Sequence, residues 1–377
     1  MIKTFKYKLY NSKKNKHLHR LINIASRVYN HCIALHKGYY RLYKKSLKKY
    51  QLQKHITKLK KLDKYKYWNE LGSQAIQDIT DRIDRAYKLF YKLRKQKIRC
   101  SVPTFKSRKK YKSFTLKQAG YKFLYENKVK IGNKVYKYSK DRKIEGKVKT
   151  LSVKRDLLGD IYLFVVCETD SNSEYKSMTG KIAGFDFGLK TFLTVSDGTK
   201  VKSPEFLKNN IKELKKKSRL LSKKNKGSNN RKRARIELRK LHRNILNKRR
   251  DFFFKLAKSL VEQYDYLYFE DLNIKAMQKL WGRKINDLAF SEFLSILKNK
   301  ALEYRKCVLF IDRFYPSSKT CSKCGYINQE LELRHRSWIC SECETKHDRD
   351  LNASINIMRK GRALSFGEDT ISPISDG

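Results

Sequence analysis

Four of the eight cysteines form two Cys-x-x-Cys pairs towards the C-terminal end of the chain. Cys321 and Cys324 form the first pair, Cys340 and Cys343 form the second, and 15 residues separate the two pairs. Thiolates in such pairs bind tetrahedral zinc, and this spacing falls in the range of four-cysteine zinc ribbons. Because all four ligands are thiolates, no position is left for water, and we expect a closed, structural Zn2+ site. The nearby histidines, His335 and His347, are interpreted as ordinary polar residues.

Three carboxylates stand at positions where an acid is otherwise uncommon. Asp186 lies within the apolar strand pattern IAGFDFGL, Glu270 ends the apolar pattern YDYLYFE, and Asp350 begins the helix pattern LNASINIM. An ionised carboxylate in such surroundings is unfavourable unless a cation meets it. If the three converge, they can hold two Mg2+ ions about 4 Å apart for in-line attack of water on a phosphodiester. Two strand acids and one acid on a closing helix are the arrangement of RNase H-type nucleases.

The pattern alone leaves neighbouring acids as alternatives: Asp265, Asp271, Asp312 and Asp348. Adjacent residues of a strand point to opposite faces, so only one of Glu270 and Asp271 can point inward, and the pattern does not decide which. The choice between Asp348 and Asp350 is equally open, because either can merely cap the helix.

The charge of the chain predicts a polyanionic partner. The 377 residues include 90 Lys and Arg against 36 Asp and Glu, a formal charge of +54. Between 201 and 250 there are 20 Lys and Arg against three Glu, which favours a helical pair that grips nucleic acid. Neutralised phosphates release counterions and so favour binding. No apolar run approaches the ~20 residues that span a bilayer, so we expect no membrane association and an intracellular protein.

Apolar periodicity predicts an α/β part and an all-β part. Strands are expected within 5–12, at 129–131, 151–153 and 162–166, on both sides of Asp186, before Glu270 and at 307–312. Helices are expected within 18–35, from 73 to 93 with Ser73 as N-cap, within 201–250 and from Asp350. The first half of the chain is therefore interpreted as a β-unit that a helical insert interrupts.

Four segments occur in the order GFDFGLKTFLTVSDG, YLYFEDLNIKAM, FYPSSKTCSKCG and HDRDLNASINI, with the cysteine pairs between the second and third acids. Together these segments resemble TnpB, the family of RNA-guided nucleases encoded by insertion sequences and related to type V CRISPR effectors. The resemblance implies Asp186, Glu270 and Asp350 as a RuvC-type catalytic triad that binds Mg2+. It also implies Zn2+ on Cys321, Cys324, Cys340 and Cys343.

The resemblance further implies the domain organisation. It consists of a wedge β-barrel at 1–170 with a helical recognition insert at about 13–100, a linker at 171–180, an RNase H-like (RuvC) domain at 181–318 and 345–360, a zinc ribbon at 319–344 and a disordered tail at 361–377. The partners would be a guide RNA and double-stranded target DNA, with base pairing reading the sequence and the protein gripping the backbone. Gln74 and Gln77, near a helix start in the insert, are candidates for base contacts with a short motif that flanks the target.

Other functions remain open alternatives: a miniature type V CRISPR effector, a catalytically silent RNA-guided DNA-binding relative, and a transposase. The acid order Asp, Glu, Asp disfavours a transposase, in which Asp, Asp, Glu is usual. One departure from the family is that Ala289 and Phe290 stand where many relatives carry Gly-Trp. For localisation we expect the cytoplasm of a bacterium or archaeon, in association with the nucleoid.

Overall fold

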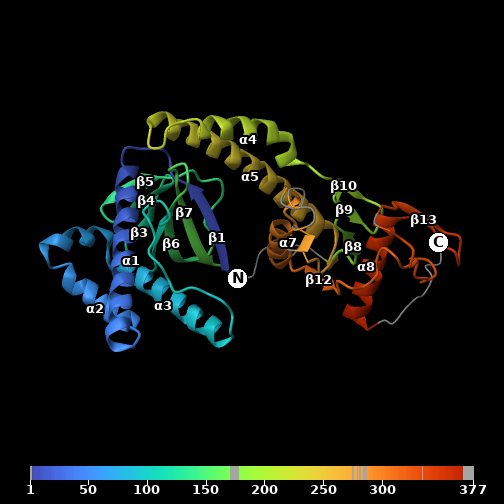
Figure 1. Ribbon diagram of the computed structural model, residues 1–377, viewed down its shortest axis with the longest axis horizontal. Helices are drawn as coiled ribbons and strands as arrows, with labels where there is room; N and C mark the ends of the chain where they lie inside the picture. The colour runs from blue at the N-terminus through green and yellow to red at the C-terminus, as the bar shows by residue number, and fades with distance from the viewer. Residues whose placement is uncertain are drawn as a thin grey trace. The chain divides into compact units, whose positions relative to one another are not determined.

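The computed structural model describes residues 2–169, 178–273, 276–277, 279, 282, 287–332 and 334–367. The chain forms two compact units, Met1–Ser171 and Asn172–Gly377 (Figure 1). Most of the expected linker at 171–180 lies outside the described residues. In the described part of the chain, every helix is too short or too polar to cross a membrane.

The first unit combines two antiparallel sheets with a group of helices. One sheet has the order β1 (Ile2–Lys8), β7 (Ile161–Glu168), β6 (Lys147–Arg155), β2 (Ser113–Leu116). The other has the order β3 (Tyr121–Leu124), β4 (Lys128–Ile131), β5 (Lys134–Lys137). The helices α1 (Asn15–Tyr43), α2 (Lys49–Leu59), η1 (Asp63–Leu71) and α3 (Ser73–Lys95) lie between β1 and β2 in the sequence. The predicted helical insert is therefore present.

Alternation of apolar and polar residues explains how this unit forms its core. Along β7, Ile161, Leu163, Val165 and Cys167 are buried, while the residues between them are partly exposed. Ser73 is not the helix cap that the sequence predicts. Gly72, with a φ of 77°, takes the N-cap position, and Ser73 is the first helical residue. Glycine adopts this left-handed conformation without the steric penalty of a side chain, and so it suits the N-cap position of α3 better than serine does.

The second unit is built on a five-stranded mixed sheet. Its order is β10 (Lys200–Lys202), β9 (Thr191–Val195), β8 (Ile182–Asp186), β11 (Tyr266–Glu270), β12 (Cys307–Ile311). The strands β8, β11 and β12 are parallel, and β9 and β10 run antiparallel to their neighbours. The remaining elements are α4 (Phe206–Ser222), α5 (Asn229–Gln263), α7 (Phe290–Tyr304), β13 (Ser337–Ile339), β14 (Lys346–Asp348) and α8 (Arg349–Phe366).

Helices cover both faces of this sheet. On one face, Leu267 and Phe269 of β11 pack with Phe253 of α5 and Phe293 of α7. On the other face, Tyr268 packs with Ile357 of α8. Because side chains alternate along a strand, residues of β11 with even numbers face α8.

The C-terminal helix extends beyond its predicted end. The tail was expected to be disordered from 361, but α8 continues to Phe366, where Gly367 ends it in the left-handed conformation. Gly361 explains the continuation. A Cβ at this position would lie 2.2 Å from the ring of Tyr268, so the helix backbone packs directly on the sheet here. Residues 368–377 of the expected tail lie outside the described residues.

Candidate active site and metal centre

The four paired cysteines converge as the sequence predicts. Their sulfur atoms all lie within 4.8 Å of one another. Cys321 Sγ lies 3.6 Å from Cys343 Sγ, and Cys324 Sγ lies 3.5 Å from Cys340 Sγ. Tetrahedral zinc with bonds of about 2.3 Å separates its ligand sulfurs by about 3.8 Å. The donor set and its size therefore fit a zinc ion.

His347 lies against this cluster, which its sequence context did not indicate. Its ring is buried next to Trp338, at 4.8 Å between centroids, and its Nε2 lies 3.0 Å from Cys321 Sγ. Burial lowers the pKa of His347, which favours the neutral ring. A neutral ring with a proton on Nε2 donates a hydrogen bond to the thiolate, as groups surrounding a metal site commonly do. His335 is exposed, and its Nδ1 accepts a hydrogen bond from the amide of Glu332.

Two of the three acids stand at the same edge of the sheet because their strands are parallel and in register. Phe185 pairs with Phe269, so Asp186 and Glu270 are the next residues of β8 and β11. Both share the side of Tyr268, the side that α8 covers. The register thus answers the question that the sequence left open between Glu270 and Asp271. Asp271 is exposed and forms an ion pair with Arg313.

The third acid is brought to this edge by the start of α8. Asp348 is the N-cap, because its Oδ1 accepts hydrogen bonds from the amides of Asp350 and Leu351, at 3.1 and 3.0 Å. Asp348 Oδ2 is paired with Lys200 at 2.7 Å. Asp350 is therefore the acid of the first turn that does not cap the helix, and its Oδ2 lies 3.9 Å from where a Cβ of Gly188 would stand, just after β8.

A glycine on β8 allows α8 to approach this closely. A Cβ on Gly184 would lie 2.1 Å from the carbonyl oxygen of Ser354 and 2.4 Å from the amide nitrogen of Met358. Any side chain there would push the helix backbone off the strand. Gly184 therefore sets how near Asp350 comes to Asp186.

The pKa of Asp186 indicates that the three acids lie close enough for their charges to interact. Burial raises the pKa of Asp186 to about 8, and the charges of Asp350 and Glu270 add to this effect, while Arg349 opposes it. Burial also raises the pKa of Glu270, and the hydroxyl of Ser317, which donates to Glu270 Oε1 at 2.6 Å, partly offsets this. A divalent cation is the natural compensation for such a group of acids.

The three carboxylates do not form as tight a cluster as the four cysteines. Among the described residues, the four cysteines are the only group of three or more His, Cys, Asp or Glu side chains whose ligand atoms all lie within 4.8 Å of one another. Two ions about 4 Å apart use ligands spread over a larger span. Arg349 and Arg336 lie 3.5 and 3.8 Å from Asp350 Oδ1 and supply positive charge at this edge.

The other candidate acids are already engaged elsewhere. Asp265 is buried at the opposite end of β11 and paired with Lys306. Asp312 Oδ1 accepts a hydrogen bond from the amide of Phe314 at 2.7 Å. Neither extends the group formed by Asp186, Glu270 and Asp350.

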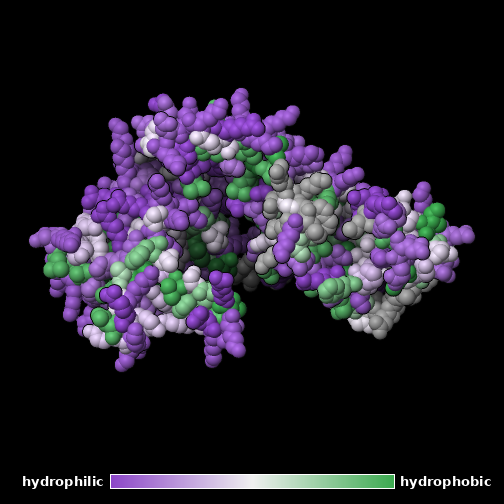
Figure 2. Space-filling view, in the orientation of Figure 1, coloured by the Kyte–Doolittle hydropathy of each residue, from purple (hydrophilic) through white to green (hydrophobic). Residues whose placement is uncertain are grey.

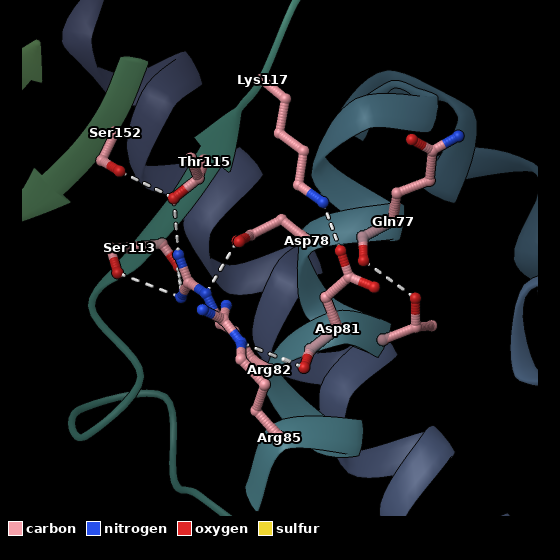
Figure 3. Close-up of polar contacts among 10 residues, drawn as sticks. Gln77, Asp78, Asp81, Arg82, Arg85, Ser113, Thr115, Lys117 and Ser152 are labelled. Atoms are coloured by element: carbon pink, nitrogen blue, oxygen red, sulfur yellow. Dashed lines mark hydrogen bonds and ion pairs between the residues drawn. The ribbon is translucent and has the colours of Figure 1, made fainter. Parts of the chain in front are cut away.

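Gln74 and Gln77 lie in the first unit, in the first two turns of α3. Gln74 is half-buried and lines a cavity of about 490 Å³, whereas Gln77 is exposed. The side chain of Gln77 points away from the ionic network on the next turns of the helix (Figure 3). In that network Arg82 pairs with Asp78 at 2.7 Å and donates to Thr115, and Lys117 pairs with Asp81.

A basic surface covers the helices after β10. Hydrophilic side chains dominate the visible face of α4 and α5 (Figure 2). In the part of the chain that the structure describes, five cations of α4 and its C-cap line one exposed hollow without an acidic partner: Lys212, Lys215, Lys216, Arg219 and Lys223. Such a face has the chemistry to bind a phosphate backbone.

Comparisons with known proteins identify a family and a shared fold. Residues 164–280 match the family model OrfB_IS605, described as a probable transposase, and residues 290–357 match the TNB domain of Cas12f1-like proteins. The solved complex of Cas12f1 with sgRNA and target DNA aligns over 95% of this chain and 98% of that chain, with a TM-score of 0.60 and 15% identity. At that identity the likeness shows a shared fold.

Two curated relatives cover most of the chain. A protein of Streptomyces pristinaespiralis, described as a candidate RNA-guided DNA endonuclease, is 31% identical over 325 residues, which are 84% of this chain and 79% of the relative. InsQ of Escherichia coli (strain K12), with the same description, is 28% identical over 78% of this chain and 76% of its own. These matches confirm the resemblance seen in the sequence: the chain belongs to the TnpB family of RNA-guided DNA endonucleases.

Proposed function

We propose that this chain is an RNA-guided DNA endonuclease. A guide RNA pairs with one strand of a double-stranded DNA target beside a short flanking motif, and the protein hydrolyses phosphodiester bonds. The descriptions of the relatives support the class of activity. The charge of +54 supports polyanionic partners. The single observation that carries the proposal is the convergence of Asp186, Glu270 and Asp350 at one edge of the sheet.

Within this proposal the second unit is an RNase H-like (RuvC) nuclease domain with an inserted zinc ribbon. The domain would comprise 181–318 and 345–366, the latter extended to the observed end of α8, and the ribbon 319–344. The parallel strands β8, β11 and β12 under α8 support this assignment. The first unit would be the wedge domain, a β-barrel at 1–170 with a recognition insert at about 13–100. The helices between β1 and β2 support the insert.

The proposed catalytic residues are Asp186, Glu270 and Asp350, which would hold two Mg2+ ions. Ions held there would supply an activated water and stabilise the leaving oxygen of the phosphodiester. The charges of the other two acids both act on Asp186, so it is placed to share a metal ion with either. Ser317 fixes one oxygen of Glu270 and leaves the other available. Arg349 and Arg336, beside Asp350, are placed to hold a phosphate of the substrate strand.

The test is cleavage by the purified chain with the RNA that accompanies it. Sequencing this RNA identifies the guide, and a plasmid library with the matching target and randomised flanks reports the flanking motif. Asp186→Asn, Glu270→Gln and Asp350→Asn each should lose Mg2+-dependent cleavage and keep guided binding. Asp271→Asn is the matched control, since its carboxylate faces Arg313 and should be dispensable. Cleavage that survives in all three variants would exclude this triad.

We also propose that the four cysteines hold a structural zinc ion. Cys340→Ser should release zinc and lower the melting temperature of the full chain. The control is Cys100→Ser, a cysteine in the first unit that belongs to no cluster among the described residues. An unchanged melting temperature in Cys340→Ser would contradict a structural role.

A further inference from the structure

Two buried asparagines on α8 hold the turn at 317–322. The side chains of Asn352 and Asn356, one helical turn apart, are 1% and 3% exposed. Both Nδ2 atoms donate to the carbonyl oxygen of Thr320, at 2.7 and 2.6 Å. Asn356 also donates to the carbonyl oxygen of Ser317 at 2.8 Å, and Asn352 Oδ1 accepts from the amide of Ser322 at 2.9 Å. The amides therefore take the place of water as hydrogen-bond partners for the backbone of this turn.

The turn joins the zinc centre to the acid site. Its first residue, Ser317, is 5% exposed and donates its hydroxyl to Glu270 Oε1 at 2.6 Å. Cys321, the first zinc-type ligand, lies within the turn. The length of the bond to Glu270 is typical of a charge-assisted hydrogen bond, which is about twice as strong as a neutral one. The same turn thus contacts Glu270, carries Cys321 and is hydrogen-bonded to the helix that carries Asp350.

We propose that Ser317 is a positioning residue for Glu270, and that Asn352 and Asn356 act through it. This inference rests on the proposed nuclease function and deepens it. Glu270 stands at the end of a strand, where its side chain has several rotamers open to it. The Ser317 hydroxyl selects the rotamer that turns the other oxygen towards Asp186. The four-cysteine cluster and α8 keep that hydroxyl in place. The proposed zinc site and the proposed Mg2+ site are therefore mechanically coupled.

The experiment compares four variants of the full chain with its guide RNA: Ser317→Ala, Ser317→Thr, Ser318→Ala and Asn356→Asp. Ser318→Ala is the matched control, because it also removes a serine hydroxyl, but from the next residue, whose side chain is only half-buried. Mn2+ binding is measured by titration calorimetry without DNA, and cleavage is measured as a function of Mg2+ concentration. Zinc content is measured for every variant.

Ser317→Ala should weaken Mn2+ binding and raise the Mg2+ concentration for half-maximal cleavage, each by about 10-fold or more, as for other groups that orient metal ligands. Zinc content and guided DNA binding should not change. Ser317→Thr keeps the hydroxyl and should restore both quantities. Asn356→Asp, which replaces a donor by an acceptor facing two carbonyls, should act in the same direction as Ser317→Ala.

The inference would be overturned if the Mn2+ affinity of Ser317→Ala and its Mg2+ concentration for half-maximal cleavage both stay within about twofold of the wild-type chain. It would also be overturned if Ser318→Ala loses as much as Ser317→Ala. In either case the proposed function would still hold if the wild-type chain binds Mn2+ and cleaves DNA. A wild-type chain that neither binds Mn2+ nor cleaves DNA would overturn both the inference and the proposed function.

Discussion

At the scale of single residues, the sequence was most informative where the chemistry is local. The Cys-x-x-Cys spacing predicted all four members of the sulfur cluster, because each pair lies within one turn of backbone. The roles of Ser317, Asn352 and Asn356 were not predicted. They depend on contacts with residues 30 or more positions away, and such contacts leave no period in the sequence. His347 was interpreted as an ordinary polar residue for the same reason.

Ala289 adopts a left-handed conformation with a φ of 47° at the start of α7. A Cβ in this conformation costs roughly 1–2 kcal/mol, and glycine avoids this cost. Glycine also has a higher conformational entropy in the unfolded chain, which cancels part of the gain. Ala289→Gly should therefore stabilise the full chain by about 0.5–1 kcal/mol in urea unfolding. Ala363→Gly, inside α8, is the control and should destabilise by about 1 kcal/mol. A loss of stability in Ala289→Gly would contradict the strain.

A buried ion pair at the start of three strands gives a second prediction. Asp265 and Lys306 are paired with side chains 1% and 2% exposed, and Asp265 Oδ2 also accepts from the amide of Gly180 at 2.7 Å. Asp265→Asn leaves the Lys306 charge buried and should cost about 3–5 kcal/mol in the free energy of unfolding. Asp251→Asn, in an exposed pair with Lys255, should cost less than about 0.5 kcal/mol.

The pH dependence of this effect has a defined sign. Burial acts to raise the pKa of Asp265, but hydrogen bonds from Lys306 and Gly180 outweigh it and leave the pKa below its ordinary value. The pair's contribution is therefore complete at neutral pH and is lost as the pH falls through the folded-state pKa, below about 4. The difference in stability between the unchanged chain and Asp265→Asn should shrink only in that range. A difference that already shrinks between pH 7 and pH 5 would contradict this assignment.

At the scale of elements, the strands and long helices followed from periodicity, whereas their contacts did not. The register of β8 with β11 placed Glu270 rather than Asp271 beside Asp186, and the alternation within one strand could not decide this. The end of α8 was predicted too early, because the sequence around Gly361 gives no sign that its backbone packs on Tyr268.

The contact of α8 with β8 predicts that a single methyl group at Gly184 disrupts the site. In Gly184→Ala the new Cβ meets helix backbone rather than a flexible side chain, so α8 must move. Overpacking of this kind costs typically 1–3 kcal/mol, and the displacement should abolish cleavage in a chain that still binds its guide. Gly38→Ala in α1, where nothing lies within 4 Å, should instead stabilise the chain by about 0.5–1 kcal/mol. Normal cleavage in Gly184→Ala would show that the position of α8 is not critical.

At the scale of the whole molecule, net charge indicated a polyanionic partner, and the structure now shows which charges are available. Exposed lysines of the second unit differ in their surroundings. Lys208, Lys255 and Lys258 each lie within 3.9 Å of an acid three or four residues away. Lys212, Lys215 and Lys216 share a hollow on α4 and form no ion pair with the described residues. The second group can neutralise phosphates without first losing a partner.

This difference predicts the salt dependence of DNA binding. Each phosphate contact to duplex DNA contributes about 0.9 to the slope of log K against log salt concentration. Changing Lys212, Lys215 and Lys216 together to Gln should lower the slope of the RNA-free chain by up to about 3, measured by fluorescence anisotropy on a duplex of arbitrary sequence. Changing Lys208, Lys255 and Lys258 to Gln removes the same formal charge and should leave the slope nearly unchanged, because those charges are already compensated. Equal losses in the two triple variants would mean that binding responds to net charge and that α4 has no particular role.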